Sequence, residues 1–128
     1  MYNRDYKGYK DLNVYQVAYQ LALDIHKITK EFPAEEKYSL VDQIRRSSRS
    51  VPANIAEAWK RRRYKKAFIS KIIDCAGEAS ETEVWLDFAK DYDYITDECH
   101  DKLINKCDEV SRMLYGMIDQ ADKFCSEL

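Results

Sequence analysis

The chain contains little of what turns and β-sheets are made from, with three Gly and two Pro among 128 residues. Charged residues make up 34% of it. This composition favours long helices over sheets. The length suits one domain that buries a core of its own. We therefore expect an all-α protein.

Long apolar runs are also missing. No stretch approaches the roughly 18 apolar residues that a membrane-spanning helix requires, and residues 1–5 lack the apolar segment of a signal peptide. The net charge of −2 argues against a surface that is basic all over, as unspecific nucleic-acid or membrane binding would need. We expect a cytoplasmic protein whose charge has to be judged locally.

Patterns typical of metal and catalytic sites do not occur. His26 and His100 belong to neither a Glu-x-x-His nor a His-Glu-x-x-His motif, and there is no Gly-rich phosphate loop. The four Cys form no CxxC pair, so we expect free thiols. The sequence predicts no metal, no cofactor and no catalysis. A site assembled from distant Ser, His, Asp or Cys residues leaves no local pattern and is not addressed by this argument.

Apolar residues recur at alternating steps of four and three in four segments, which is the pattern of helices packed at small crossing angles. The first two stripes are Val14, Ala18, Leu21, Ile25, Ile28, Phe32 and Val41, Ile44, Ser48, Val51, Ile55, Ala58. The last two are Phe68, Ile72, Cys75, Ala79, Leu86, Ala89, interrupted by Thr82, and Leu103, Cys107, Val110, Leu114, Met117, Ala121, Phe124. Because the connections are short, the stripes predict an antiparallel up-down-up-down four-helix bundle.

Local signals give the expected helix ends. Asp11 and Thr96 are suitable N-caps for the first and fourth helices. Pro33 disfavours helical geometry in Phe32 and so ends the first. We expect residues 11–128 to form the bundle and residues 1–10, rich in Tyr, Lys and Arg, to form an arm that is either mobile or docked on a neighbouring subunit.

Pro52 lies inside the second stripe. It has no N–H to donate to the carbonyl of Ser48, so we expect helix two to continue with a kink. Ser48, Ser50 or Asn54 would then satisfy the freed backbone groups.

The turn between helices two and three carries no Gly or Pro. If the chain did not turn there, one helix would run over residues 35–92 for about 87 Å, which is too long for so small a domain. Cations crowd residues 60–66, and like charges at helical spacing repel each other. We place the turn at residues 61–64.

Charge is strongly segregated. Residues 43–73 hold ten Lys or Arg and one acid, Glu57, although the whole chain is net negative. In a hairpin of helices two and three, Arg46 would face Glu81 and Arg49 would face Glu78. We therefore expect Arg45, Arg46 and Arg49 to be mainly internal partners of carboxylates.

The hairpin tip lacks local acids apart from Glu57, so its cations are candidates for phosphate contacts. Tyr64 could stack on an unpaired base, and Trp59 could either do the same or pack in the core. The candidate nucleic-acid-binding residues are Lys60, Arg61, Arg62, Arg63, Tyr64, Lys65, Lys66 and Lys71. The alternative for this tip is a merely solvated charged turn.

Several strings are similar to one known family. The most specific is QIRRSSRSVPANIAE at residues 43–57, supported by LNVYQ at 12–16, by Phe32-Pro33 followed by Glu36, Tyr38 and Leu40, and by LDFA at 86–89. Over roughly residues 9–95 the chain resembles the four-helix bundle proteins encoded in intervening sequences of 23S rRNA genes, which are related to accessory proteins of diversity-generating retroelements. The resemblance implies a bundle that assembles as a ring, of five subunits, without known catalysis.

Two functions are compatible with these features. The leading hypothesis is a non-catalytic homo-oligomeric scaffold that binds structured RNA, or an RNA–DNA intermediate with its reverse transcriptase, through repeated basic tips. The alternative is an assembly or adaptor protein whose tip meets an acidic protein partner. Trp85, Tyr92 and Tyr94 beside the third stripe suit a subunit interface or the core.

Overall fold

The computed structural model describes residues 7–125, in which all regular secondary structure is helical. The four long helices are α1 Asn13–Thr29, α2 Leu40–Lys60, α3 Lys65–Asp91 and α4 Asp97–Asp119. Three short elements are η1 Tyr9–Asp11, η2 Ala34–Glu36 and α5 Ala121–Cys125. The predicted all-α class with four long helices is confirmed.

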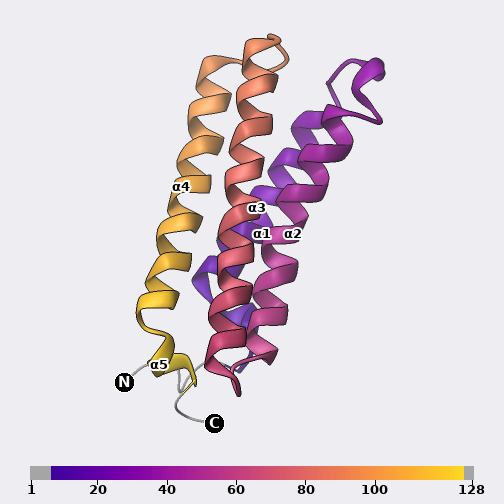
Figure 1. The fold of residues 1–128 in the computed structure, drawn as a ribbon. Helices are drawn as coiled ribbons and strands as arrows, with labels where there is room; N and C mark the ends of the chain where they lie inside the picture. Colours follow the sequence, from indigo (N-terminus) through magenta and orange to yellow (C-terminus); the bar gives the residue numbers. More distant parts are fainter. Residues whose placement is uncertain (1–6, 126–128) are drawn as a thin grey trace.

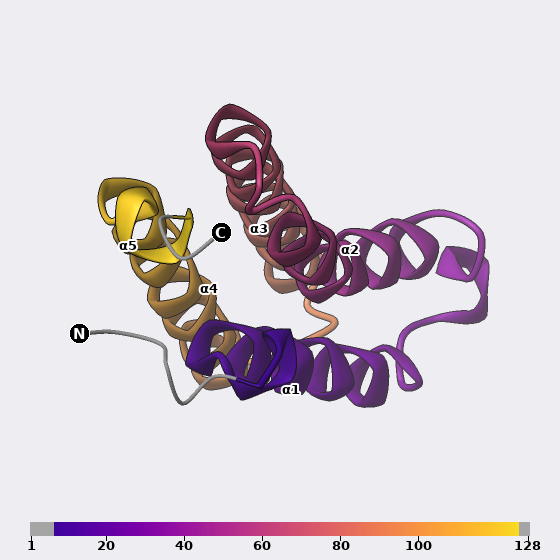
Figure 2. The same cartoon turned by 90° about the horizontal axis from the view of Figure 1, so that it is seen from below.

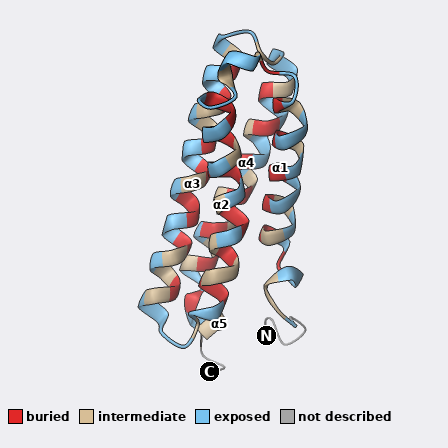
Figure 3. Cartoon of the chain, turned by 90° about the vertical axis from the view of Figure 1, so that its right-hand side faces the viewer, coloured by how far each residue is buried: buried red, intermediate tan, exposed pale blue. Residues whose placement is uncertain are grey.

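The four long helices lie side by side around a common core (Figures 1 and 2). α2 packs against α3, α3 against α4, and α1 against both α2 and α4. Within the described residues the backbones of α1 and α3 are not neighbours, so these two helices are diagonal in the bundle. η1, the α2–α3 turn and α5 gather at one end (Figures 1 and 3).

The predicted stripes form the core (Figure 3). Every member is buried except Ile28 and Phe124, which are partly buried and pack against it. Cys75 and Cys107 are fully buried, and burial raises the pKa of each thiol to about 12. Both therefore stay protonated at neutral pH and behave as small hydrophobic side chains.

Thr82, which interrupts the third stripe, has a buried polar partner. Its hydroxyl lies 2.8 Å from that of Ser47 on α2, and it donates to the carbonyl of Glu78 at 2.9 Å. Ser47 and Thr82 are almost completely buried. The pair joins α2 to α3 without leaving an unsatisfied hydroxyl in the core.

The predicted caps had different outcomes. Thr96 caps α4, because its hydroxyl accepts the N–H of Cys99 at 3.1 Å. The prediction for Asp11 is wrong, since α1 begins at Asn13 with Leu12 in the N-cap position. Asp11 belongs to the preceding turn η1, where its carboxylate accepts the N–H of Lys7 at 2.7 Å.

Helix α2 continues through Pro52. The Ser48 hydroxyl donates to the carbonyl of Arg45 and the Ser50 hydroxyl to that of Arg46. Asn54 makes no side-chain hydrogen bond within the described residues. The prediction that these side chains satisfy the Ser48 carbonyl is therefore wrong, since the hydroxyls bond to carbonyls one turn behind them.

The turn at residues 61–64 lies where the cation crowding places it. The fourth stripe, in contrast, does not follow one helix to Phe124, because α4 ends at Asp119 and α5 starts at Ala121. The break turns Phe124 back over the end of the core, where its ring lies 6.1 Å from Phe68 and 6.2 Å from Trp59 between centroids.

Candidate nucleic-acid interface

The end of α2 is closed by Arg62. Its guanidinium carbon lies 3.8 Å from the centre of the Trp59 ring, and its Nε donates to the Trp59 carbonyl at 2.9 Å. A cation over an indole face, bonded to a carbonyl at a helix C-terminus, is stabilising on both counts. Trp59 itself is buried. Of the two alternatives for Trp59, core packing is the one observed.

Three of the predicted tip cations already have carboxylate partners. Glu57 pairs with Arg61 at 2.6 Å and with Lys71 at 3.4 Å, and the pKa of Glu57 is lowered chiefly by the Arg61 hydrogen bond. Lys71 also lies 3.7 Å from Asp74, and Lys65 lies 2.5 Å from Asp122. The prediction that Glu57 is the only acid near the tip is therefore wrong. α5 brings Asp122 to the tip from a distant part of the sequence.

The other predicted residues remain accessible. Lys60, Arg63 and Lys66 are exposed and make no ion pair with any described residue. The Tyr64 side chain, in the last position before α3, is 68% exposed. These four residues are the part of the predicted tip that a phosphate or a base can reach.

The N-terminal segment adds cations that sequence reasoning had not placed. Lys7, Tyr9 and Lys10 line a cleft of about 620 Å³ together with Lys60 and Arg63. We call it the basic cleft; Gly8, Asp11, Trp59 and Arg62 complete its lining. The one carboxylate among its described lining residues, Asp11, accepts the N–H of Lys7. The alternation of Lys and Tyr was visible in the sequence, but its position depends on the η1 turn. Residues 1–6 of the predicted arm lie outside the described residues.

The arginines in the middle of α2 do not pair with α3 as predicted. Arg46 pairs with Asp42 on its own helix at 3.2 Å, with 70% of its side chain exposed. Arg49 is exposed and makes no ion pair within the described residues. The α2 surface that faces α3 is occupied by Ser47 and the apolar stripe, so both arginines lie outside the contact.

The acids on α3 also show that Arg46 and Arg49 are not their partners. The pKa of Glu78 is raised by burial and by the nearby carboxylates of Glu81 and Asp74, as expected where no cation is near. Arg45 is the one of the three arginines with an internal role. Its Nε donates to the Thr29 hydroxyl at 2.8 Å and its Nη2 to the His26 carbonyl at 3.2 Å, which ties α2 to the last turn of α1.

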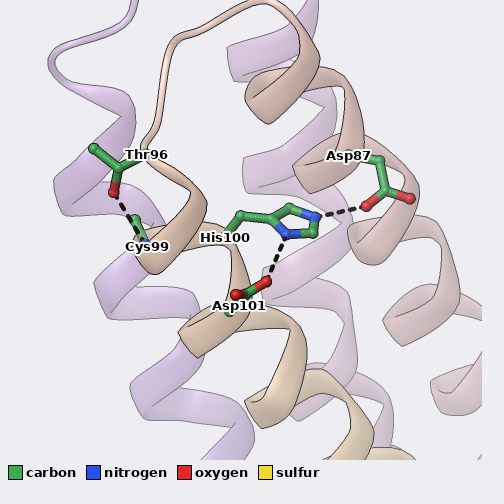
Figure 4. A network of polar contacts seen from close by, with 5 residues as sticks. All are labelled: Asp87, Thr96, Cys99, His100 and Asp101. Atoms are coloured by element: carbon green, nitrogen blue, oxygen red, sulfur yellow. Dashed lines mark hydrogen bonds and ion pairs between the residues drawn. The ribbon is translucent and has the colours of Figure 1, made fainter.

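Figure 4 shows a network of polar contacts that joins α3 to α4. His100 is buried, with Nε2 2.7 Å from Asp87 and Nδ1 3.4 Å from Asp101. With both ring nitrogens engaged, the histidine links the two helices. Over residues 7–125, no group of three or more His, Cys, Asp or Glu is arranged to hold a metal ion.

The fold and the basic end define an all-helical bundle with one cationic pole. The chain belongs to the family of 23S rRNA-intervening sequence proteins, which it matches over residues 10–116. It is similar to a crystal structure of a protein with unknown function from the S23 ribosomal protein family of Bacteroides thetaiotaomicron. The two are 32% identical with a TM-score of 0.75, and the match covers 83% of this chain and 95% of that one. No curated protein matches the sequence. The resemblance found in the sequence is confirmed.

The neighbouring arginines Arg45 and Arg46 should differ in their effect on stability. Arg45→Gln removes charged hydrogen bonds to the end of α1 and should lower the free energy of unfolding by about 1–2 kcal/mol. Arg46→Gln removes an exposed pair within one helix and should change it by less than about 0.5 kcal/mol. Urea unfolding followed by circular dichroism measures both. An Arg46→Gln loss equal to that of Arg45→Gln would contradict the assignment.

Proposed function

We propose that this protein is a non-catalytic oligomeric scaffold that binds structured RNA through the basic cleft and the adjoining α2–α3 turn. The observation that carries the proposal is the convergence of Lys7 and Lys10 with Lys60 and Arg63 around one cleft. Among the described residues that line it, Asp11 is the one carboxylate, and it is engaged with the backbone. Membership of an rRNA-intervening sequence family is compatible with an RNA-related role.

Phosphate binding is the chemistry that this arrangement supports. Each cation that replaces a condensed counterion on RNA contributes a favourable, salt-dependent release term. The exposed phenol ring of Tyr64 stands beside Arg63 and Lys65 and offers a face for one unpaired base. An RNA hairpin presents both phosphates and unpaired loop bases, so it fits better than a plain duplex.

The same surface would also bind RNA–DNA intermediates, since RNA and RNA–DNA hybrids both carry the phosphate groups that the cleft would contact. We include a reverse transcriptase as a candidate partner of the scaffold, on the strength of the family resemblance alone. The cytoplasm is the compartment we propose for this activity, consistent with four cysteines that form no disulfide. None of the described helices combines the length and apolar character needed to cross a membrane.

We propose that the scaffold itself is an antiparallel up-down-up-down bundle with a bend in α2 at Pro52. Short connections at residues 61–64 and 92–96 support the alternation of helix directions. Pro52 supports the bend because it removes one backbone donor from the middle of α2.

We further propose that the subunits assemble into a ring, of five by the family resemblance. The C-terminal half of α3 carries the exposed apolar side chains of Val84 and Phe88, and Tyr92 follows directly after the helix. Ile73 is a further exposed apolar residue three turns earlier. Successive aromatic rings from Trp85 through Phe88 and Tyr92 to Tyr94 lie 5.5 to 6.0 Å apart between centroids. Trp85 and Tyr94 pack partly into the core, whereas Phe88 and Tyr92 face outward. Exposed aromatics of this kind anchor subunit contacts, and a ring would repeat the basic cleft and raise its avidity.

Replacing the three unpaired tip cations should remove RNA binding without affecting the fold. We expect the triple variant Lys60→Gln, Arg63→Gln, Lys66→Gln to bind a labelled RNA hairpin much more weakly than the parent. Its log–log salt plot should be flatter by roughly 0.7 for each lost phosphate contact. Fluorescence anisotropy over a salt series measures both effects.

The matched control changes three exposed lysines elsewhere, Lys27, Lys37 and Lys102, to Gln, and should bind almost as the parent does. Equal losses in both triple variants would show that net charge, and no particular site, governs binding. If the parent binds no RNA or DNA at low salt, the proposal fails. The adaptor function, with an acidic protein at the same cleft, would then take its place.

The molecular mass of the protein in solution tests whether the subunits assemble. Light scattering at micromolar concentration should give a multiple of the 15.1 kDa subunit. Val84→Gln with Phe88→Gln should shift the mass towards the monomer, because it replaces the two exposed apolar side chains on the C-terminal half of α3. Tyr115→Gln on α4 changes an equally exposed aromatic and should leave the mass unchanged. A monomeric parent protein would rule out the ring.

A further inference from the structure

A second hollow lies between α1 and α2, and it differs from the basic cleft in its chemistry. It has a volume of about 590 Å³, within the range of about 300–1,000 Å³ typical of ligand pockets. One wall carries Tyr9, Tyr15 and Tyr19, and the facing wall carries Pro52, Ala53 and Ala56. The rings, from η1 and α1, lie opposite small residues of α2, which leaves the space between them open. We call it the tyrosine groove.

The three tyrosines form a continuous row. The ring centroids of Tyr9 and Tyr15 are 5.1 Å apart in an edge-to-face pair, and those of Tyr15 and Tyr19 are 5.8 Å apart with a tilt of 32°. The pKa of Tyr15 is raised by burial and by the two neighbouring phenols. Tyr15 is therefore uncharged at neutral pH, and the row presents neutral aromatic surface.

The tyrosine groove continues the basic cleft. Tyr9 lines both hollows, since η1 lies where the end of α2 meets α1. The cationic cleft and the aromatic groove therefore adjoin at the Tyr9 side chain. A strand with phosphates beside Lys10 and Lys60 would have its next bases near Tyr9.

The far end of the groove is again cationic. Arg49 supplies the positive charge there and lies beside the neutral imidazole of His26, and no carboxylate is among the described lining residues. The pKa of His26 is lowered mainly by Arg45, then by burial, Lys30 and Arg49, which reports a positive field at this end. Arg49 makes no ion pair within the described residues, so its charge is available to an anion.

We propose that the tyrosine groove binds unpaired bases of a single-stranded nucleic acid whose backbone is held by the basic cleft at one end and by Arg49 at the other. Stacking platforms within a cationic channel are how proteins hold single strands without reading their sequence. Paired bases cannot enter, because their faces are covered by their neighbours. This inference rests on the proposed function and adds the class of nucleic acid that the site accepts.

Tyr19 gives the sharpest test, because its side chain is 49% exposed and its replacement should not unfold the helix. Tyr19→Leu keeps the apolar character but removes the ring. We expect it to weaken binding of a labelled single-stranded RNA by about five- to a hundred-fold, the effect of losing one stacked base. Binding of a duplex of equal length should stay within about two-fold, and Tyr19→Phe should bind as the parent does.

Two further variants make the result specific. Tyr115→Leu on α4 removes a ring of similar exposure, 55%, and should have no effect on either ligand. Arg49→Gln should weaken single-strand binding and flatten its salt dependence by roughly 0.7, one phosphate contact. Circular dichroism and light scattering on every variant show that fold and mass are retained.

The failures of the two proposals can be told apart. If Tyr19→Leu binds single strands like the parent while the Lys60, Arg63, Lys66 variant does not, the groove assignment is wrong and the proposed function stands. If Tyr19→Leu changes the oligomer mass, the groove is occupied by a second copy of the chain and the assignment is again wrong. If the parent binds no nucleic acid, both fall together.

Discussion

The contact between Arg62 and Trp59 is the interaction on which the rest of the molecule depends. Together with the repulsion among the crowded cations, it ends α2 where the apolar periodicity would continue, because Arg62 covers the indole face and takes up a terminal carbonyl. Because the chain reverses there, α3 can pack along α2 and Phe124 can close the core against Trp59 and Phe68. The same reversal leaves Lys60, Arg63 and Lys66 exposed at one pole. Arg62 thus stabilises the fold, whereas Lys60, Arg63 and Lys66 remain accessible to a ligand.

The exposed cations and the acids of α3 lie on different faces of the bundle. The basic cleft and the α1–α2 face carry Lys10, Lys60, Arg63 and Arg49, none of which makes an ion pair with a described residue, whereas Asp74, Glu78 and Glu81 lie together on α3. α1 and α3 are diagonal, so the acids do not lie over the tyrosine groove of the same chain. Under the proposed function, a polyanion would lie on the side of the basic cleft, and the exposed apolar side chains of α3 would serve other contacts. A net negative protein can in this way present a strongly basic surface.

Much of this fold is predictable from the sequence because it is governed by local periodicity. The four stripes identify the core almost completely, and crowded cations locate the α2–α3 turn without Gly or Pro. Thr96 is recognisable as a cap because its hydroxyl acts within three residues. The features that were mispredicted depend on contacts between distant segments. Asp122 reaches Lys65 because α4 ends at Asp119 and the chain changes direction before α5. Asp11 does not cap α1 because its carboxylate accepts the N–H of Lys7 in the segment that leads into η1. The rotation of α2 about its axis, which places Arg46 and Arg49 outside the α3 contact, is set by how Ser47 and Thr82 meet.

The central claim is that the pole formed by η1 and the α2–α3 turn is where nucleic acid is bound. Lysine acetylation followed by mass spectrometry, with and without an RNA hairpin at low salt, maps that contact on the unmodified sequence. If nucleic acid binds at this pole, RNA should protect Lys10, Lys60 and Lys66, Lys27 and Lys102 should react equally in both samples, and added salt should abolish the protection. Protection centred on Lys27 or Lys102, or no protection at any lysine, would contradict it.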